Sequence, residues 1–153
     1  MKEIQELINI SQKYGQDSRY VIAGGGNTSY KNADKLWVKA SGHALATITE
    51  DGFAVLDRAK LNLMSTKTYS TDSAAREEEV KNDLADACIT KDRRPSVETS
   101  LHNAMSAAYV IHMHPTLVNG LMCSQKAEEE ECKALFGDDV VYIPYHYGCC
   151  DIN

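Results

Sequence analysis

Residues 110–115 read Val-Ile-His-Met-His-Pro, an apolar run that carries two histidines and is ended by a proline. This composition predicts a short strand, because β-branched residues favour strands and proline cannot continue the hydrogen-bonded ladder. Successive side chains of a strand point to opposite faces, so His112 and His114 share one face while Ile111 and Met113 share the other. Two imidazoles side by side at a strand end predict half of a zinc site.

A structural histidine pair in the core is the alternative to a metal role. Burying either imidazole without a partner costs about 1–3 kcal/mol, which favours a metal role for the pair. A catalytic zinc ion normally takes three protein ligands plus a water or substrate. Spacing along the chain does not assign the third ligand to any of the other histidines, which are His43, His102 and His146.

The segment Arg94-Pro95-Ser96-Val97-Glu98 has the pattern of a helix start. Ser96 is a favourable N-cap, and Glu98 lies in the first turn, where the helix dipole favours a carboxylate. Apolar residues then recur at helical spacing up to Ala108. This interpretation needs no catalysis. In the functional alternative, Ser96 and the helix N-terminus bind a phosphate, and Glu98 faces the metal as a proton carrier.

Residues 24–29 form a glycine-rich turn, Gly-Gly-Gly-Asn-Thr-Ser, after a predicted strand at 20–23. The turn matches neither the dinucleotide-binding fingerprint nor the Walker loop. Glycine and asparagine are what a tight turn requires, so a plain turn explains the segment. The alternative is an anion cradle in which backbone N–H groups are joined by the side chains of Asn27 and Ser29.

Residues 39–42, Lys-Ala-Ser-Gly, lead a second predicted strand into a small polar turn. The end of a strand explains this pattern when it is considered alone. In the functional interpretation, Ser41 and the Gly42 N–H group close the same anion pocket.

Hydrophobic periodicity predicts helices and strands in alternation along the chain. Helices are expected at 3–14, 73–88, 96–108, 117–123 and 124–136, and strands at 20–23, 36–40, 53–56, 110–114 and 140–143. This order favours an α/β or α+β sandwich around one sheet.

Length and charge limit the class of protein. The chain has 153 residues, 43% hydrophobic and 25% charged, which predicts a single globular domain. Its net charge of −6 argues against general nucleic-acid binding but is compatible with a small phosphorylated ligand. The sequence contains neither an apolar run of about 18 residues nor a signal peptide, so we expect no membrane association and a cytoplasmic location. The 5 cysteines are then expected to be reduced.

Four motifs in this order resemble those of the class II aldolase/adducin family: Gly-Gly-Asn-Thr-Ser, Lys-Ala-Ser-Gly, Arg-Pro-Ser-Val-Glu-Thr and His-Met-His-Pro. Within the family, the chain is most similar to the aldolase half of bifunctional rhamnulose-1-phosphate aldolase/alcohol dehydrogenase proteins. The resemblance covers nearly the whole chain from Tyr20 onward. It implies one class II aldolase-like domain over residues 1–153, an α/β fold built as a three-layer α/β/α sandwich around a mostly antiparallel central sheet.

The resemblance also implies roles for particular residues. Glu98 occupies the position of the family's catalytic acid/base, and His112 and His114 occupy the positions of its paired Zn²⁺ ligands. Val97 stands where some members have a second phosphate-binding serine. The positions that bind the substrate phosphate in the family are filled by Gly26, Asn27, Ser41, Gly42 and Ser96.

The implied activity is that of a zinc-dependent aldolase, in a homo-oligomer that is often a tetramer in this family. It would reversibly cleave a ketose 1-phosphate such as rhamnulose 1-phosphate into dihydroxyacetone phosphate and an aldehyde. A sugar-phosphate epimerase or dehydratase on the same scaffold is an alternative, as is a non-catalytic adducin-like binding domain or a structural metal protein. The family's third zinc histidine comes from a later His-Gly segment, so we expect the chain to lack the family's C-terminal portion.

Overall fold

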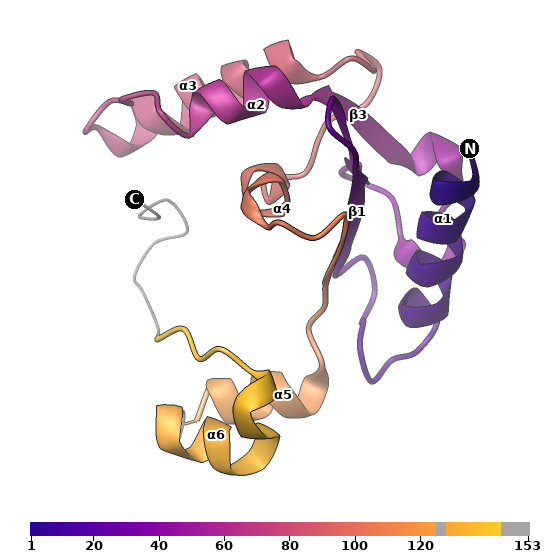
Figure 1. Ribbon diagram of the computed structural model, residues 1–153, viewed down its shortest axis with the longest axis vertical. Helices are drawn as coiled ribbons and strands as arrows, with labels where there is room; N and C mark the ends of the chain where they lie inside the picture. Colours follow the sequence, from indigo (N-terminus) through magenta and orange to yellow (C-terminus); the bar gives the residue numbers. More distant parts are fainter. Residues whose placement is uncertain (125–127, 145–153) are drawn as a thin grey trace. The chain divides into compact units, whose positions relative to one another are not determined.

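The computed structural model describes residues 1–124 and 128–144, and Figure 1 shows its ribbon. The chain divides into two compact units, one comprising Met1–His114 and one beginning at Pro115. The first unit contains α1 (Lys2–Gly15), β1 (Asn27–Lys31), β2 (Lys35–Lys39), η1 (Leu45–Thr47), η2 (Glu50–Gly52), β3 (Phe53–Asp57), α2 (Arg58–Met64), α3 (Ser73–Ala87), α4 (Thr99–Ala104) and β4 (Tyr109–His112). The second contains α5 (Thr116–Met122), α6 (Glu129–Phe136) and η3 (Gly137–Asp139).

The strands of the described residues form one sheet in the order β3-β2-β1-β4, and every neighbouring pair is antiparallel. Asn32 closes the β1–β2 hairpin. Its side-chain oxygen accepts hydrogen bonds from the backbone N–H groups of Asp34 and Lys35. On the other side of β1, the register pairs Asn27 with His112. The end of the glycine-rich turn therefore lies beside the first histidine of the pair.

One face of the sheet, the α1 side, packs against α1 (Figure 1). Helix α1 buries Ile4 and Leu7, which share one stripe of the helix, against Trp37 and Phe53 of the sheet. Removing each such side chain from water contributes roughly 1.5–3 kcal/mol. Helix α1 ends at Gly15, and this position requires glycine because a Cβ atom there would lie 2.4 Å from the backbone nitrogen of Ala46.

The opposite face, the α4 side, carries α2, α3 and α4 (Figure 1). Alternate residues of β2 and β3 point to this side because the side-chain period of a strand is two. They form one cluster with the inward residues of α2 and α3, consisting of Leu36, Val38, Ala40, Ala54, Leu56, Leu61, Leu84, Ala87 and Cys88. Helices on both faces of an antiparallel sheet confirm the predicted three-layer α/β/α sandwich.

Two predicted strands are wrong, and one predicted helix is too long. Residues 20–23 form a turn and loop instead of a strand, because Ala23 takes a positive φ of 54°, and β1 begins only at Asn27. The helix predicted at 96–108 is limited to α4, since Met105 already has extended dihedrals. Residues 140–143 form a loop instead of a strand, and the predicted start of the preceding helix falls partly on residues outside the described ranges.

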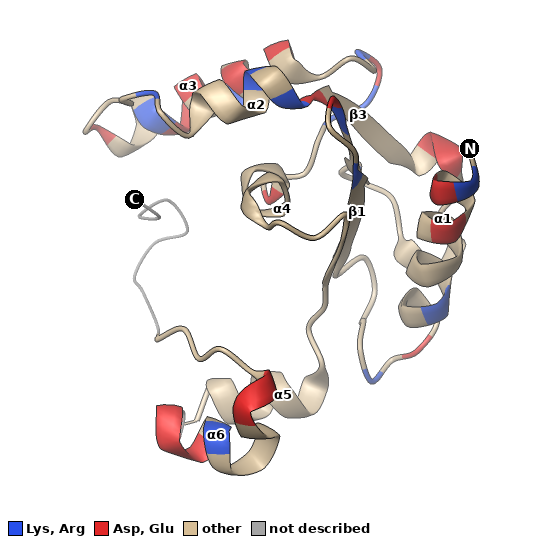
Figure 2. Cartoon of the chain, in the orientation of Figure 1, with Lys and Arg blue, Asp and Glu red and all other residues tan. Residues whose placement is uncertain are grey.

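The second unit is small, and α6 buries Cys132 with its sulfur 3.8 Å from that of Met122. Cys88, Cys123 and Cys132 are free thiols, while Cys149 and Cys150 lie outside the described residues. Among the described helices, none combines the length and the apolar character needed to cross a bilayer. Helices α1 and α3 carry charges of both signs, and α2 carries only Arg58 and Lys60 (Figure 2), so these helices offer no continuous basic stripe to a nucleic acid.

Candidate metal centre

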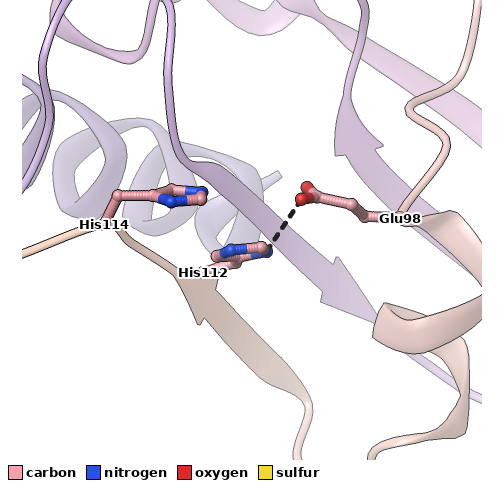
Figure 3. A group of neighbouring side chains, drawn as sticks. All are labelled: Glu98, His112 and His114. Atoms are coloured by element: carbon pink, nitrogen blue, oxygen red, sulfur yellow. Dashed lines mark ion pairs between the residues drawn. The ribbon is translucent and has the colours of Figure 1, made fainter. Parts of the chain in front are cut away.

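The paired histidines lie where β4 ends, at the edge of the sheet. His112 is the last residue of β4, and His114 is held two residues later by the hydrogen bond from its backbone N–H to the carbonyl of Tyr20 (3.1 Å). Their rings are stacked, with centroids 4.7 Å apart and planes inclined by 23° (Figure 3). Met113, between them, packs into the cluster on the α1 side. The two imidazoles therefore share one side of the chain, as strand alternation requires.

Glu98 comes from the segment just before α4 and points toward the histidines (Figure 3). Its Oε1 atom lies 3.0 Å from Nδ1 of His112, and its Oε2 atom accepts a hydrogen bond from Nδ2 of Asn27 (2.9 Å). One ligand atom from each of Glu98, His112 and His114 lies within 4.8 Å of the others. The structure thus gathers a carboxylate and two imidazoles from segments that are separate in the sequence.

The contact between Glu98 and His112 tests whether a cation fits this group. Within the described residues, Nδ1 of His112 is buried and has no hydrogen-bond partner, although the Glu98 carboxylate is only 3.0 Å away. A ring nitrogen and a carboxylate oxygen approach this closely only with a proton or a metal ion between them, because two lone pairs repel each other. A proton or a metal ion satisfies this requirement, and neutral imidazole with carboxylate is a donor set that Zn²⁺ accepts. The residues present therefore fit a divalent cation.

The segments predicted to bind phosphate lie next to one another. An isolated bridge joins Ala40 to Pro95, and the N–H of Ser41 donates to the carbonyl of Arg94 (2.9 Å). The turn containing Gly42 is thereby placed beside the segment containing Ser96. Gly42 is exposed and has a φ of +88°, with open space around the position of a Cβ atom. The phosphate roles of these residues stay predictions.

Ser96 does not cap an α-helix as expected. Helix α4 begins at Thr99 with Glu98 in the N-cap position, and the hydroxyl of Ser96 accepts the N–H of Glu98 at 3.3 Å. Ser96 therefore stabilises the turn that presents Glu98. Its carbonyl accepts the Thr99 hydroxyl at 2.5 Å, which tightens the same turn.

The glycine-rich turn contributes in two ways. Gly26 has a φ of +75°, and a Cβ atom there would lie 3.0 Å from Cδ1 of Leu45 and 3.2 Å from the carbonyl oxygen of His112. Only glycine lets the turn pass so close to the end of β4. Asn27, next in sequence, is 1% exposed, and its amide donates to Glu98.

Ser29 and the other histidines depart from the expected pattern. Ser29 is fully buried and hydrogen-bonded to Nδ1 of His102 at 2.7 Å, so its hydroxyl is not exposed to a ligand as the anion-cradle interpretation required. His102 is fully buried, and burial lowers its pKa to about 4. His43 is exposed, and His146 lies outside the described residues.

Two buried lysines near this region were not singled out from the sequence. Lys31 donates to the carbonyl of His102 at 2.6 Å, and Lys39 donates to the carbonyl of His43 at 2.9 Å. Burial lowers the pKa of both ammonium groups, and for Lys39 the charge of Glu98 opposes that shift. The sequence carries no periodic signal for Lys31, because Asn27, Thr28 and Ser29 before it are all polar.

Known proteins resemble the chain over most of its length. The family described as "Class II Aldolase and Adducin N-terminal domain" matches residues 5–149. A Bacillus subtilis (strain 168) protein named "Uncharacterized oxidoreductase YuxG" is 30% identical over 154 residues, which cover 94% of this chain and 22% of that protein.

A solved structure has the same fold. It is titled "Structure of the N-terminal Class II Aldolase domain of a conserved protein from Thermoplasma acidophilum" and superimposes with a TM-score of 0.75 at 27% identity. The match covers 88% of this chain and 65% of that one. This chain therefore spans under two thirds of the solved relative and about a fifth of the curated one.

Proposed function

The chain belongs to the class II aldolase and adducin family, and on that premise we propose that it is a zinc-dependent aldolase acting on a ketose 1-phosphate. The substrate we propose is rhamnulose 1-phosphate or a close analogue, cleaved reversibly into dihydroxyacetone phosphate and a small aldehyde. The observation that carries this proposal is the approach of Glu98 to within 3.0 Å of His112, with His114 stacked beside it. This geometry supports the proposal that Glu98 is the proton carrier beside the two imidazoles that would hold the ion.

In this proposal the metal ion supplies Lewis-acid chemistry, and proton transfer is left to Glu98. His112 and His114 would hold a Zn²⁺ ion, whose Lewis acidity stabilises the negative charge that develops on the ketose oxygen during cleavage, a contribution of several kcal/mol. Glu98 is the proton carrier and not a required ligand. The third protein ligand that a catalytic zinc normally takes is left unassigned.

One carboxylate oxygen of Glu98 is hydrogen-bonded to Asn27, and the other can take part in proton transfer. Asn27 occupies Oε2, so Oε1 is the oxygen that faces His112 and the ligand position. Glu98 takes the proton of the C4 hydroxyl as the C3–C4 bond of the ketose breaks, so that C4 becomes the aldehyde carbon. The electron pair of the broken bond passes toward the C2 carbonyl oxygen and leaves an enediolate. Glu98 then returns a proton to C3 and removes it again in the synthetic direction, a role worth about 10²–10⁴ in rate.

The phosphate end of the substrate would lie in the adjoining turns. Gly26 and Asn27 at the start of β1, Ser41 and Gly42 after β2, and Ser96 before α4 are the proposed contacts. Support comes from the bridge between Ala40 and Pro95, which keeps two of these turns together. We further propose a homo-oligomer, often a tetramer in this family, located in the cytoplasm.

Glu98→Gln provides the main test of the proposed activity. The amide keeps the size of the side chain but cannot carry the proton, so turnover of rhamnulose 1-phosphate should fall about 10²–10⁴-fold while zinc content is retained. Glu77→Gln, an exposed glutamate on α3, is the matched control and should keep wild-type turnover. Turnover near wild type in Glu98→Gln would show that the assigned role is wrong.

A substrate panel separates the proposed activity from the alternatives. Ketose 1-phosphates should yield dihydroxyacetone phosphate, detected by coupled reduction. A stereoisomer or a dehydrated sugar as product would instead assign the scaffold to epimerisation or dehydration.

A further inference from the structure

Strand β1 buries polar side chains on the face where a sandwich normally buries apolar ones. Asn27, Ser29 and Lys31 point to the α4 side and are 1%, 0% and 5% exposed. Polar groups so deeply buried are costly unless they are hydrogen-bonded. Each of the three side chains makes a hydrogen bond, although the Oδ1 atom of Asn27 has no partner among the described residues. The partners of the three side chains show which part of the chain this face positions.

All three side chains reach the same short stretch of chain. Asn27 donates to the Glu98 carboxylate at 2.9 Å, Ser29 is bonded to Nδ1 of His102 at 2.7 Å, and Lys31 donates to the His102 carbonyl at 2.6 Å. His102 is one helical turn after Glu98, and its N–H donates to the Glu98 carbonyl at 3.1 Å. Both ends of this turn are thus tied to β1.

Helix α4 depends on such ties for its position. It has only 6 residues, too few to persist without tertiary contacts. If the Ser29–His102 bond were absent, no bond from β1 to the His102 ring would remain in the described structure, and this turn would be tied to β1 by Asn27 at Glu98 and by Lys31 at the His102 carbonyl. A small rotation of α4 would then move the carboxylate away from His112.

From these contacts we propose that Ser29 and His102 form a positioning pair, which fixes the Glu98 carboxylate against Asn27 and His112. Neither residue belongs to the candidate metal group or to the proposed phosphate contacts. Within the described residues, Nε2 of His102 is buried without a hydrogen-bond partner, so the pair is not optimised for stability alone. The catalytic consequence of the inference rests on the proposed function, but its structural consequence does not.

The first test observes the side-chain amide of Asn27 by ¹⁵N-resolved NMR in the full chain. Ser29→Ala and His102→Leu should shift the Asn27 amide signals toward those of a solvent-exposed asparagine. His102→Asn, whose short amide can replace Nδ1, should restore them in part. Gln12, whose amide donates to the Ile48 carbonyl on the α1 side, is the internal reference and should not move.

Ser11→Ala is the matched control for this experiment. Its hydroxyl is also fully buried and bonded at 2.7 Å to a residue of β1, Thr28, but on the opposite face of the strand. It should leave the Asn27 signals in place. If Ser29→Ala and His102→Leu also leave them in place, the positioning pair is refuted; Ser29→Ala decides alone if His102→Leu does not fold.

The second test measures turnover of the ketose 1-phosphate. Misplacement of Glu98 by about 1 Å should lower kcat of Ser29→Ala and His102→Leu by up to about 10²-fold with little change in KM. His102→Asn should recover most of kcat, which loss of stability alone would not explain. An unchanged kcat in both variants contradicts the inference, whereas an inactive wild-type protein contradicts only the proposed function and leaves the NMR result to decide.

Discussion

The two faces of β1 are buried to a similar degree but by opposite chemistry. Toward α1, Tyr30 packs on Trp37 with ring centroids 5.6 Å apart, and apart from the Thr28–Ser11 hydrogen bond the surrounding cluster is apolar or aromatic. Toward α4, Asn27, Ser29 and Lys31 are each held by a directed hydrogen bond. The apolar face tolerates small displacements because dispersion contacts have little directionality, whereas the polar face specifies where Glu98 must lie. The comparison teaches that stability and site geometry are carried by different sides of one strand.

Phe53→Ala should disrupt the apolar cluster on the α1 side and should have the largest effect on stability. Phe53 is fully buried, and a phenylalanine-to-alanine change in a core costs about 3–5 kcal/mol. Urea unfolding followed by circular dichroism measures the loss. Metal bound per folded chain should not change, and Phe53→Leu repeats the test if the alanine variant does not fold. Loss of metal binding while the chain remains folded would show that stability and site geometry are not carried by separate faces of β1.

The pH dependence of the free energy of unfolding should reveal the burial of His102 on the α4 side. Burial lowers the pKa of His102 to about 4, so below pH 6.5 the unfolded chain binds a proton that the folded chain refuses. The free energy of unfolding should therefore decrease as the pH falls from about 6.5 to about 4, by up to about 1.4 kcal/mol per pH unit, and this contribution should level off below that range.

Comparison with His102→Leu isolates this effect from the other titrating groups. Urea unfolding of both proteins at several values between pH 7 and pH 4 gives the difference in slope. The variant should lack the His102 contribution, and identical slopes would contradict the assignment.

Alanine substitutions at two glycines with positive φ, Gly26 and Gly42, should have smaller effects on stability and test the geometry of the site. Alanine at Gly26 or Gly42 introduces backbone strain of about 1–3 kcal/mol at either position. At Gly26 the added Cβ atom also presses on Leu45 and on the carbonyl of His112, whereas the space at Gly42 is open. Gly26→Ala should lower the melting temperature further than Gly42→Ala and alone weaken metal binding, as measured by Zn²⁺ titration. Equal effects of Gly26→Ala and Gly42→Ala on Zn²⁺ binding would show that the close approach of Gly26 to His112 does not shape the site.

Much of the α1 side could be predicted from the sequence because its signal is local. The apolar stripe with Ile4 and Leu7 has helical spacing, and the alternation around Met113 places His112 and His114 on one side. Both features depend only on the period of the element in which they lie. The layered fold followed from the resemblance of the motifs.

The α4 side could be predicted less well because its signal is not local. The bond between Asn27 and Glu98 joins residues 71 apart, and no periodicity in either segment indicates the other. Asn27, Thr28 and Ser29 read as a turn because their polar composition is typical of turns, yet they begin β1. The prediction that Ser29 lines an anion cradle failed for the same reason, because its partner is His102, which lies 73 residues further along the chain.

The central claim is that the imidazoles of His112 and His114 hold a divalent cation beside Glu98. Titration of the purified, metal-free full chain with Zn²⁺, followed by calorimetry and elemental analysis, tests it most directly. The account predicts stoichiometric binding that is lost in His112→Ala and kept in His43→Ala, a control that removes an exposed histidine outside the group. Equal Zn²⁺ binding by the two variants would contradict it.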